Sequence, residues 1–425
     1  MKLFNLEEKN TSVKQEMMAG FTSFFAISYI IVVNPLILAD AGMPAQLSVF
    51  ATIFVSAIGS ILMGIWGKAP LVMTPGMGVN AFFTYTIVGS MGLSWQEALA
   101  VVVTSSFIFI IIGYTNISTL LVQAIPDSLK HGITAGIGLF LVMIGLENGG
   151  IIVDGGANSF VVLGDLTNPL TLLALLGITL SAVLYLRRVR GSYFIGIVVV
   201  TLLSLVLGAH TPGDSSFSLS NLTEYPALIG AFDFSSAFTI PFILAVFSLT
   251  MILIFESIGL FEGMLEDKSR FKNAFRVSGV MTLLSGLLGT SPTIPAAESA
   301  SGIKEGGKTG LTAVTAGVLF LLSLAFTPLL AYIPNAALAP VIVITGAIMM
   351  ENLQHIPFDD FSEWLPAFFI VVMIPLTSSI VDGLAFGFIA YPILKLAIGE
   401  IGTVKKEMRI VSFLFLLTMI AIAVL

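Results

Sequence analysis

Apolar residues follow one another along this chain in runs that approach the width of a bilayer. A helix needs about 20 predominantly apolar residues to cross the hydrocarbon core. Nine runs come near that length: Met17–Leu38, Leu47–Trp66, Ala98–Tyr114, Leu170–Leu186, Tyr193–Leu207, Phe238–Phe261, Gly310–Ala331, Ala336–Met350 and Trp364–Leu376. Five further spans are shorter or interrupted by Gly, Pro or charges: Ala69–Val88, His131–Glu147, Phe275–Leu288, Ile294–Ile303 and Val381–Ile398. The pattern predicts an all-α polytopic membrane protein with fourteen transmembrane spans.

Composition supports this prediction. Of the 425 residues, 56% are hydrophobic and 10% are charged, against roughly 25% charged in soluble domains. The absence of cysteine excludes disulfides, thiolate chemistry and cysteine-based metal sites. A formal net charge of -7 argues against a nucleic-acid partner. The start of the chain, Met1–Glu16, mixes acidic and basic residues, so we expect an uncleaved first span.

The placement of charge orients the spans. With a cytoplasmic N-terminus, all 18 Lys and Arg fall in loops and tails on one side, as the positive-inside rule requires. The loop Glu351–Glu363 is acidic yet falls on the cytoplasmic side. The rule tolerates this, because Asp and Glu contribute little to the orientation of the spans. We predict a multi-pass protein of the cell (inner or plasma) membrane. The last apolar stretch, Ile410–Leu425, is either a fifteenth span or an interfacial helix.

Three short motifs recur in the same order in the two halves of the chain. Gly64–Pro70 and Gly286–Pro292 share the pattern G-x-x-G-x-x-P, Ile125–Asp127 matches Ile333–Asn335, and Glu147-Asn148 matches Glu351-Asn352. Such internal repeats are typical of secondary transporters. Because seven spans per copy is an odd number, the second copy lies upside down in the membrane. We predict a 7+7 inverted repeat.

The third and tenth spans are broken in matching places. Pro70–Phe83 and Pro292–Gly302 each open with a Pro-bounded stretch that cannot be helical and then become compatible with a helix. We therefore expect short extended segments followed by half-helices, whose first N–H groups face the membrane centre and can hold substrate atoms. Irregular backbone at that depth is tolerated only around a cavity. The alternative is a packing kink.

Two carboxyl groups lie inside predicted spans. An ionisable side chain is costly there and is found mainly where it has a function or forms a pair. Glu256 lies deep in its span, and Glu298 begins the half-helix of the tenth span. Either could carry a proton or accept hydrogen bonds from a planar heterocycle. The alternatives are a helix cap for Glu298 and a structural hydrogen bond for Glu256. Polar groups of the first span either line the cavity or bond between helices: Thr22, Ser23, Ser28, Tyr29 and Asn34.

The sequence gives little support for a metal site, a nucleotide-binding loop or an enzyme. The three histidines have no second ligand at i+3 or i+4, so we expect no metal site. Gly306-Gly307-Lys308-Thr309 ends like a P-loop, but the preceding glycine is misplaced and no strand comes before it. We expect no enzyme activity and no cofactor, with a proton as the coupling ion.

Four stretches resemble the AzgA-like guanine/hypoxanthine/adenine permeases of the nucleobase-ascorbate transporter superfamily. They are Ala19–Pro35, Thr74–Tyr85, Phe255–Gly259, and Glu298–Gly302 with Gly306–Thr312. The similarity covers nearly the whole chain. It implies a core domain (spans 1–4 and 8–11) and a gate domain (spans 5–7 and 12–14), and a possible homodimer in membrane lipid.

The resemblance divides the chain into tail, core and gate segments. These are an N-terminal tail at 1–16, core spans at 17–122, gate spans at 123–208, an external loop at 209–233, core spans at 234–331, gate spans at 332–398 and a C-terminal tail at 399–425. It assigns the acids of spans eight and ten to Glu256 and Glu298. The candidate substrate-binding residues are Glu256, Glu298, Ser299, Gly78, Val79, Asn80, Ser257, Ser23 and Ala26.

The function that follows is proton-coupled symport of a purine nucleobase into the cell. One alternative is a carrier of another planar or anionic solute, such as uracil, xanthine or sulfate, on the same fold. A passive channel is a further alternative, although half-helices and isolated carboxylates suit an occluded central site better than a continuous pore.

Overall fold

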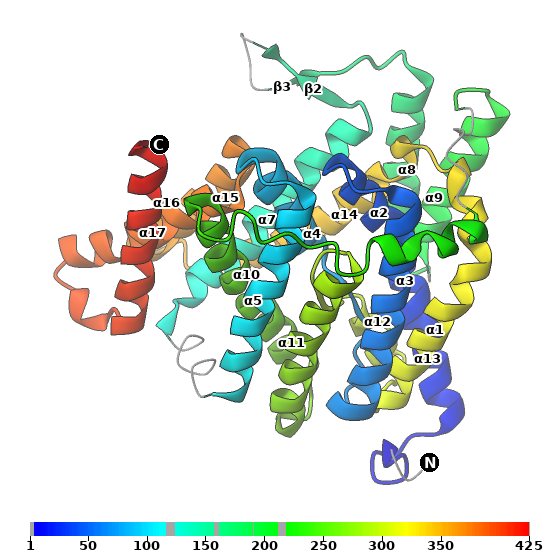
Figure 1. Ribbon diagram of the computed structural model, residues 1–425, viewed down its shortest axis with the longest axis horizontal. Coiled ribbons are helices and arrows are strands. Elements are labelled where there is room, and N and C mark those ends of the chain that lie inside the picture. The colour runs from blue at the N-terminus through cyan, green and yellow to red at the C-terminus, as the bar shows by residue number, and fades with distance from the viewer. Residues whose placement is uncertain (1–3, 116–123, 157–160, 190, 211–217, 425) are drawn as a thin grey trace.

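The structure is a computed structural model that describes residues 4–115, 124–156, 161–189, 191–210 and 218–424, and it consists of packed helices with short strands (Figure 1). The expected boundary between residues 122 and 123, and residues 211–217 of the expected external loop, lie outside these ranges. The elements of the first half are α1 (Val13–Ile27), α2 (Ile30–Asp40), α3 (Ala45–Leu62), η2 (Met63–Gly67), β1 (Met73–Pro75), α4 (Met77–Ala81), η3 (Phe82–Ser90), α5 (Trp95–Tyr114), α7 (Asp127–Asn148), β2 (Ile152–Asp154), β3 (Val161–Leu163), α8 (Pro169–Leu186) and α9 (Ser192–Val206).

The label η marks π-helices in the first half and 3-10 helices in the second. The elements of the second half are α-helices, these 3-10 helices and one strand. They are α10 (Ile240–Met264), α11 (Phe271–Leu288), β4 (Thr293–Pro295), α12 (Ser299–Lys304), α13 (Gly310–Leu322), η8 (Ser323–Tyr332), η9 (Asn335–Ala337), α14 (Ala339–Met349), η10 (Met350–His355), α15 (Phe361–Thr377), α16 (Ile380–Ala397), η11 (Ile401–Thr403) and α17 (Lys406–Val424). Each of the fourteen expected spans corresponds to a helix, or to a strand followed by a helix, in the described residues. The last apolar stretch forms α17, which packs against α16.

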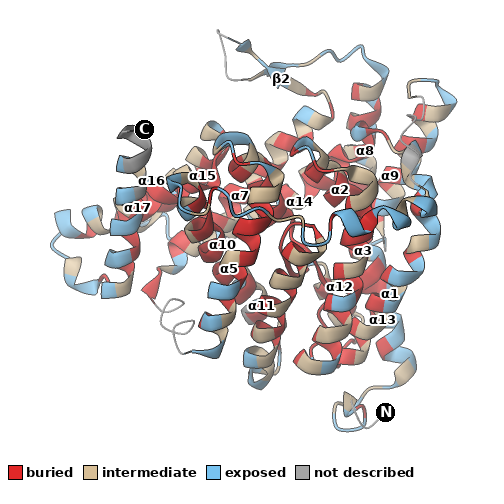
Figure 2. Cartoon of the chain, viewed as in Figure 1, coloured by how far each residue is buried: buried red, intermediate tan, exposed pale blue. Residues whose placement is uncertain are grey.

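Length and apolar character identify the membrane-crossing elements. In the described part of the chain, nine helices are long and apolar enough to span a bilayer, and two apolar helices, Ser192–Val206 and Phe361–Thr377, are shorter. Large apolar side chains are exposed on the outside of the bundle, such as Ile111 at 60% and Phe326 at 64%, while the interior is buried (Figure 2). An apolar exterior of this kind suits lipid rather than water. The chain is a multi-pass membrane protein.

Local sequence sets where several helices begin and end. Ser94 and Glu97 form a capping box at the start of α5, which satisfies backbone donors that have no helical partner. Asn168 caps α8 just before Pro169, a proline position that costs no hydrogen bond. Gly289 ends α11 at φ 80°, a left-handed conformation that glycine adopts without strain. These signals separate neighbouring spans.

The helices pack in two sets. One set, which we call the core group, comprises α1–α5 and α10–α13; the other, the gate group, comprises α7–α9 and α14–α16. Within the core group α5 packs on α11 and α13 packs on both α1 and α3, and within the gate group α7 packs on α14 and α15. The groups meet where α1 contacts α9, α4 contacts α7 and η3 contacts α16. The expectation that they are separate domains stays a prediction.

The two repeats cross inside the core group at β1 and β4. These strands pair antiparallel with Thr74 opposite Ile294. On either side of that central pair, the N–H of Gly76 donates to the carbonyl of Pro292 (3.2 Å), and the N–H of Ala296 donates to the carbonyl of Val72 (2.8 Å). The two bonds are related by a local two-fold axis, as an inverted repeat requires. Each broken span thus provides hydrogen-bond partners for the backbone N–H and C=O groups of the other.

The gate group has its own symmetric contact, between α7 and α14. A Cβ atom on Gly138 would lie 2.6 Å from the carbonyl oxygen of Gly346, and a Cβ on Gly346 would lie 2.4 Å from that of Gly138. Real Cβ contacts are not this short, so only glycine at both positions allows the two backbones to approach. Small residues play this role where membrane helices cross closely.

Gly138→Leu should therefore destabilise the gate group by about 1–3 kcal/mol or more, because added volume in a packed interface forces the helices apart. The measurement is thermal unfolding of the detergent-solubilised protein. Gly402→Leu is the matched control, since a Cβ on Gly402 has no described atom within 4 Å. Equal unfolding temperatures for the two variants would contradict the assigned contact.

Candidate functional site

Hydroxyl groups of the preceding helices hold the two strands in place. The Ser60 hydroxyl of α3 accepts a hydrogen bond from the N–H of Met73 (3.0 Å). The Ser285 hydroxyl of α11 accepts one from the N–H of Thr293 (3.1 Å). Both serines are fully buried. The extended segments are therefore fixed from both repeats, and they set the directions of the half-helices that follow.

Ser299, a predicted site residue, helps to hold the extended segment that precedes α4. Its hydroxyl accepts a hydrogen bond from the N–H of Val72 (2.9 Å). The two-fold relation centred on Thr74 and Ile294 makes Pro292 the counterpart of Val72 in the other repeat, and Val79 the counterpart of Ser299. Proline has no N–H to satisfy, so the first repeat needs no hydroxyl at Val79. Ser299 thus fixes the backbone before α4.

Glu298 lies at the N-terminal end of α12 with intermediate exposure, beside an exposed Ala297. One carboxylate oxygen accepts a hydrogen bond from the hydroxyl of Tyr29, between α1 and α2. The side chain makes no capping bond to α12, so the structure does not favour the helix-cap alternative. The carboxylate is held on one side and accessible on another, which suits a group that binds a ligand.

Glu256 lies in α10 and faces the start of α4. A Cβ atom on Gly78 would lie 3.5 Å from each of its carboxylate oxygens and 3.0 Å from a methyl group of Ile137. The Oε2 atom is buried and has no hydrogen-bond partner in the described residues. Along the same helix, Gly259 is exposed, with no described atom within 4 Å of a Cβ built on it. The carboxylate therefore faces the start of the α4 half-helix, and the same helix is exposed one turn further on.

Three more predicted residues carry unpaired polar groups. Ser23, Asn80 and Ser257 are fully buried, and within the described residues neither amide atom of Asn80 nor either hydroxyl has a hydrogen-bond partner. Leaving a buried polar group unpaired costs about 1–3 kcal/mol, so each such group requires a partner such as an ordered water or a ligand. Asn80 lies in α4 and Ser257 adjoins Glu256, so both belong to the half-helix crossing.

The remaining predicted residues are Ala26, Gly78 and Val79. Ala26 is partly exposed on α1, three residues before Tyr29, and the other two are buried in α4. Ser23, unlike the partly exposed Ala26, is enclosed by α12. Its hydroxyl lies only 2.0 Å from the position that a Cβ on Gly302 would occupy. It packs α1 closely against α12.

The two half-helices offer different backbone donors. In the first turn of α12, the N–H groups of Ser299, Ala300 and Ser301 already donate to the carbonyls three residues earlier. In α4 the first helical hydrogen bond runs from the N–H of Asn80 to the carbonyl of Gly76, four residues earlier (2.8 Å). The first N–H groups of an α-helix have no helical partner. The expectation that the first N–H groups of both half-helices are free does not hold for α12, whose first turn uses them and whose N-terminal end carries the Glu298 carboxylate.

Comparison with known proteins identifies the chain. Residues 14–386 match the family model Xan_ur_permease, described as the Permease family. The chain belongs to this permease family. It is 43% identical over 383 residues to the nucleobase transporter PlAzg2 of Paenibacillus larvae, covering 89% of this chain and 76% of the relative. It is also 36% identical to the guanine/hypoxanthine permease PbuO of Bacillus subtilis (97% and 98% covered) and 35% identical to the adenine permease AdeP of Escherichia coli (99% and 96%).

These relatives confirm the expected membership of the nucleobase-ascorbate transporter family and identify the chain as a transporter rather than an enzyme. Solved structures show the fold of the permease. The transmembrane domain of the cyanobacterial bicarbonate transporter BicA aligns with a TM-score of 0.64 at 17% identity, covering 87% of this chain and 97% of that one. The murine Slc26a9 anion transporter in the inward-facing state aligns with a TM-score of 0.59 at 12% identity, covering 88% and 67%. The expected fourteen-span 7+7 inverted repeat is confirmed.

The permease contains a buried acid that the sequence analysis missed. Glu16, expected in the cytoplasmic tail, is the fourth residue of α1 and is fully buried. Its carboxylate accepts hydrogen bonds from the N–H groups of Lys308 (3.0 Å) and Thr309 (3.1 Å) and from the hydroxyl of Thr312 (2.6 Å). The loop that ends like a P-loop therefore binds an anion, but the anion is the protein's own carboxylate at the start of α13.

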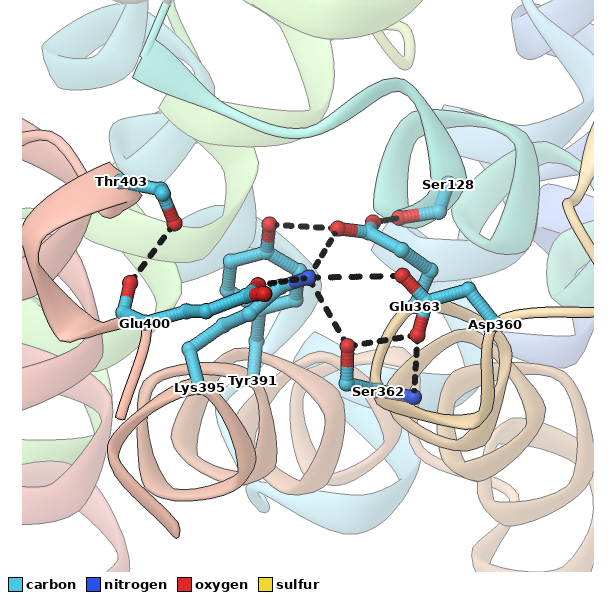
Figure 3. Close-up of polar contacts among 8 residues, drawn as sticks. All are labelled: Ser128, Asp360, Ser362, Glu363, Tyr391, Lys395, Glu400 and Thr403. Atoms are coloured by element: carbon cyan, nitrogen blue, oxygen red, sulfur yellow. Dashed lines mark hydrogen bonds and ion pairs between the residues drawn. The ribbon is translucent and has the colours of Figure 1, made fainter. Parts of the chain in front are cut away.

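A second polar cluster surrounds Lys395, at the end of α16 (Figure 3). Its side chain is 6% exposed, and its ammonium group lies 2.9 Å from Glu363, 3.6 Å from Asp360 and 3.7 Å from Glu400. It also donates to the Ser362 hydroxyl (2.8 Å). Hydrogen bonds from Ser362 hold the pKa of Asp360 below its usual range. A buried cation is thus compensated by several acids.

Glu363 of α15 connects this cluster to one more helix, α7 (Figure 3). One oxygen accepts from the Tyr391 hydroxyl (2.8 Å) and the other from the Ser128 hydroxyl of α7 (2.6 Å). The cluster therefore joins α7, α15 and α16 within the gate group, away from both intramembrane carboxyl groups. We assign it a structural role.

Lys395→Ala should lower the free energy of unfolding by about 3 kcal/mol, because removing the ammonium group leaves the largely buried Glu363 carboxylate uncompensated. Thermal unfolding in detergent measures the loss. Lys406→Ala provides the control, since Lys406 is 85% exposed. A Lys395→Ala protein as stable as this control would show that the cluster does not join the gate helices.

Proposed function

We propose that this permease is a secondary active transporter that carries a purine nucleobase, such as guanine, hypoxanthine or adenine, into the cell with a proton. The main support is a pair of intramembrane carboxyl groups without a cation. Among the described residues, neither Glu256 nor Glu298 forms an ion pair with Lys or Arg. An uncompensated charge at that depth costs about 3 kcal/mol or more. A proton or a polar ligand relieves this cost.

Purine bases match the donors and acceptors at the half-helix crossing. Guanine presents a ring N–H beside an exocyclic amine, and the two can donate to both oxygens of one carboxylate. The Asn80 amide, which has both a donor and an acceptor, has no described partner. The relatives named as guanine/hypoxanthine and adenine permeases support the same substrate class.

The two acids have different roles in this proposal. Glu298 binds the base, since Tyr29 already orients its carboxylate and the side chain is accessible. Glu256 adds a second acceptor beside Gly78, and either acid carries the proton. Gly78 to Asn80, Ala26, Ser23 and Ser257 surround the base, while Ser299 fixes the strand before α4.

An anionic substrate fits less well. Two carboxylates would repel an anion unless both were protonated. The bicarbonate and anion transporters among the structural neighbours share the fold at low identity only. Uracil and xanthine, like purines, are planar and donate N–H groups, so competition between bases must decide among them.

A cytoplasmic N-terminus in the cell membrane is part of the proposal. Lys9 forms an ion pair with Asp267 (3.1 Å), which also pairs with Arg270 (3.2 Å), and Gln15 donates to the carbonyl of Glu305. The tail and the loops before α11 and α13 therefore lie on one face. Their basic residues support assigning that face to the cytoplasm.

Counterflow of radiolabelled bases in proteoliposomes tests the function. We expect saturable purine exchange, accelerated by an inward proton gradient, with uracil, xanthine and sulfate as weaker competitors. Glu298→Gln should weaken binding roughly 10- to 100-fold, because hydrogen bonds to a charged acceptor contribute about 1.5–3 kcal/mol. Glu256→Gln should abolish binding or leave exchange without proton dependence.

Glu224→Gln, at an exposed position in the loop before α10, is the control and should behave as the parent protein. Parental transport by both Glu256→Gln and Glu298→Gln would refute the site. Non-saturable flux that does not depend on the proton gradient would favour a channel.

Movement of the core group against the gate group can be tested by cross-linking. The chain has no cysteine, and a Cβ on Gly191 of the gate group lies 3.8 Å from the Cβ of Phe25 on α1, within the range of a disulfide. Oxidation of a Phe25→Cys/Gly191→Cys variant should abolish exchange and retain binding. The single variants, and reduction of the pair, should restore exchange. Full exchange by the cross-linked protein would contradict the division into moving groups.

A further inference from the structure

Tyr29 touches both the candidate binding acid and the opposite helix group. It lies between α1 and α2 of the core group and is 1% exposed. Its hydroxyl donates to Glu298. Its ring meets the ring of Tyr193, in α9 of the gate group, edge to face with centroids 5.8 Å apart and planes at 89°. One buried side chain therefore bridges the site and the gate.

A further contact strengthens the gate side of this bridge. Tyr193 in turn stacks on Tyr185 of α8, with centroids 6.0 Å apart and planes at 17°. Aromatic pairs of this geometry are favourable beyond simple burial. The contacts run from Glu298 through three tyrosines into the gate group.

We propose that Tyr29 is a positioning residue that couples the Glu298 carboxylate to the position of the gate group. A hydrogen bond holds one oxygen of Glu298 and leaves the other for the substrate. The phenol can donate this bond only while its ring is held, and Tyr193 holds it in this conformation. When the gate group moves away, the ring loses its neighbour and the carboxylate loses its fixed orientation. The inference rests on the proposed role of Glu298 in binding.

Two substitutions separate the hydroxyl from the ring contact. Tyr29→Phe removes the donor and keeps the ring, whereas Tyr193→Leu removes the ring contact and keeps the donor. Tyr193→Phe is the matched control, because it keeps the ring at 193. The readouts are the equilibrium Kd for radiolabelled guanine, hypoxanthine and adenine in detergent, and the yield of the Phe25→Cys/Gly191→Cys cross-link at a fixed oxidation time. A purely structural residue would not change that yield in a folded protein.

Tyr29→Phe should raise the Kd roughly tenfold and lower the cross-link yield. Tyr193→Leu should lower the yield and also raise the Kd severalfold, because the Tyr29 ring is no longer held beside Glu298. Tyr193→Phe should change neither. Parental values for Tyr29→Phe, or a raised Kd with an unchanged yield, would overturn the coupling. If Tyr29→Phe does not fold, Tyr193→Leu decides alone, because a lowered yield with a parental Kd would reject the coupling.

Glu298→Gln in the same assay separates this inference from the proposed function. Parental binding by Glu298→Gln removes the basis of both. Lost binding by Glu298→Gln together with parental behaviour of Tyr29→Phe leaves the binding role of Glu298 intact and rejects only the coupling.

Discussion

Backbone N–H and C=O groups at the centre of a bilayer must find partners inside the protein, and in this permease the unwound segments find them in each other. The antiparallel pairing of Met73–Pro75 with Thr293–Pro295 allows two spans to stop being helical at membrane depth. Buried serine hydroxyls complete the arrangement. The directions of both half-helices, and therefore the location of Glu298 and of the glycine that faces Glu256, depend on this small sheet.

Much of this architecture could be predicted from the sequence. Hydropathy located the spans because their length is set by the bilayer, and the prolines at 70 and 292 marked the extended segments because proline cannot donate to a helix. Charge placement left one exception, the acidic loop before α15. There the structure supplies the reason, since Lys395 of a later helix compensates Asp360 and Glu363.

Side-chain contacts between distant segments could not be predicted. Tyr29 and Glu298 are 269 residues apart, and no local pattern marks one as the partner of the other. Glu16 looked like a tail residue because its sequence neighbours are charged, yet its carboxylate is enclosed by the start of α13. Both contacts depend on how α1 packs, which is a tertiary property.

The repeat is symmetric in backbone but not in chemistry. Gly78 and Glu298 occupy equivalent positions, four residues beyond the central pair Thr74 and Ile294. The second repeat carries its acid on the half-helix itself. In the first repeat glycine leaves space, and α10 supplies Glu256 there. The two sides of the crossing are therefore chemically different. If the crossing binds a base as proposed, an asymmetric ligand has one preferred orientation there.

The repeated Ile-Pro pairs have a mechanical consequence. Pro126 directly precedes α7 and Pro334 directly precedes η9, which are the points where each repeat passes from core helices to gate helices. A proline there fixes one backbone angle and has no N–H to lose. The carbonyls of Pro126 and Pro334 each accept a hydrogen bond from the turn that follows. The permease therefore enters its gate helices twice through a stiff, proline-capped joint, once in each repeat, so the core-to-gate connections are short levers rather than slack linkers.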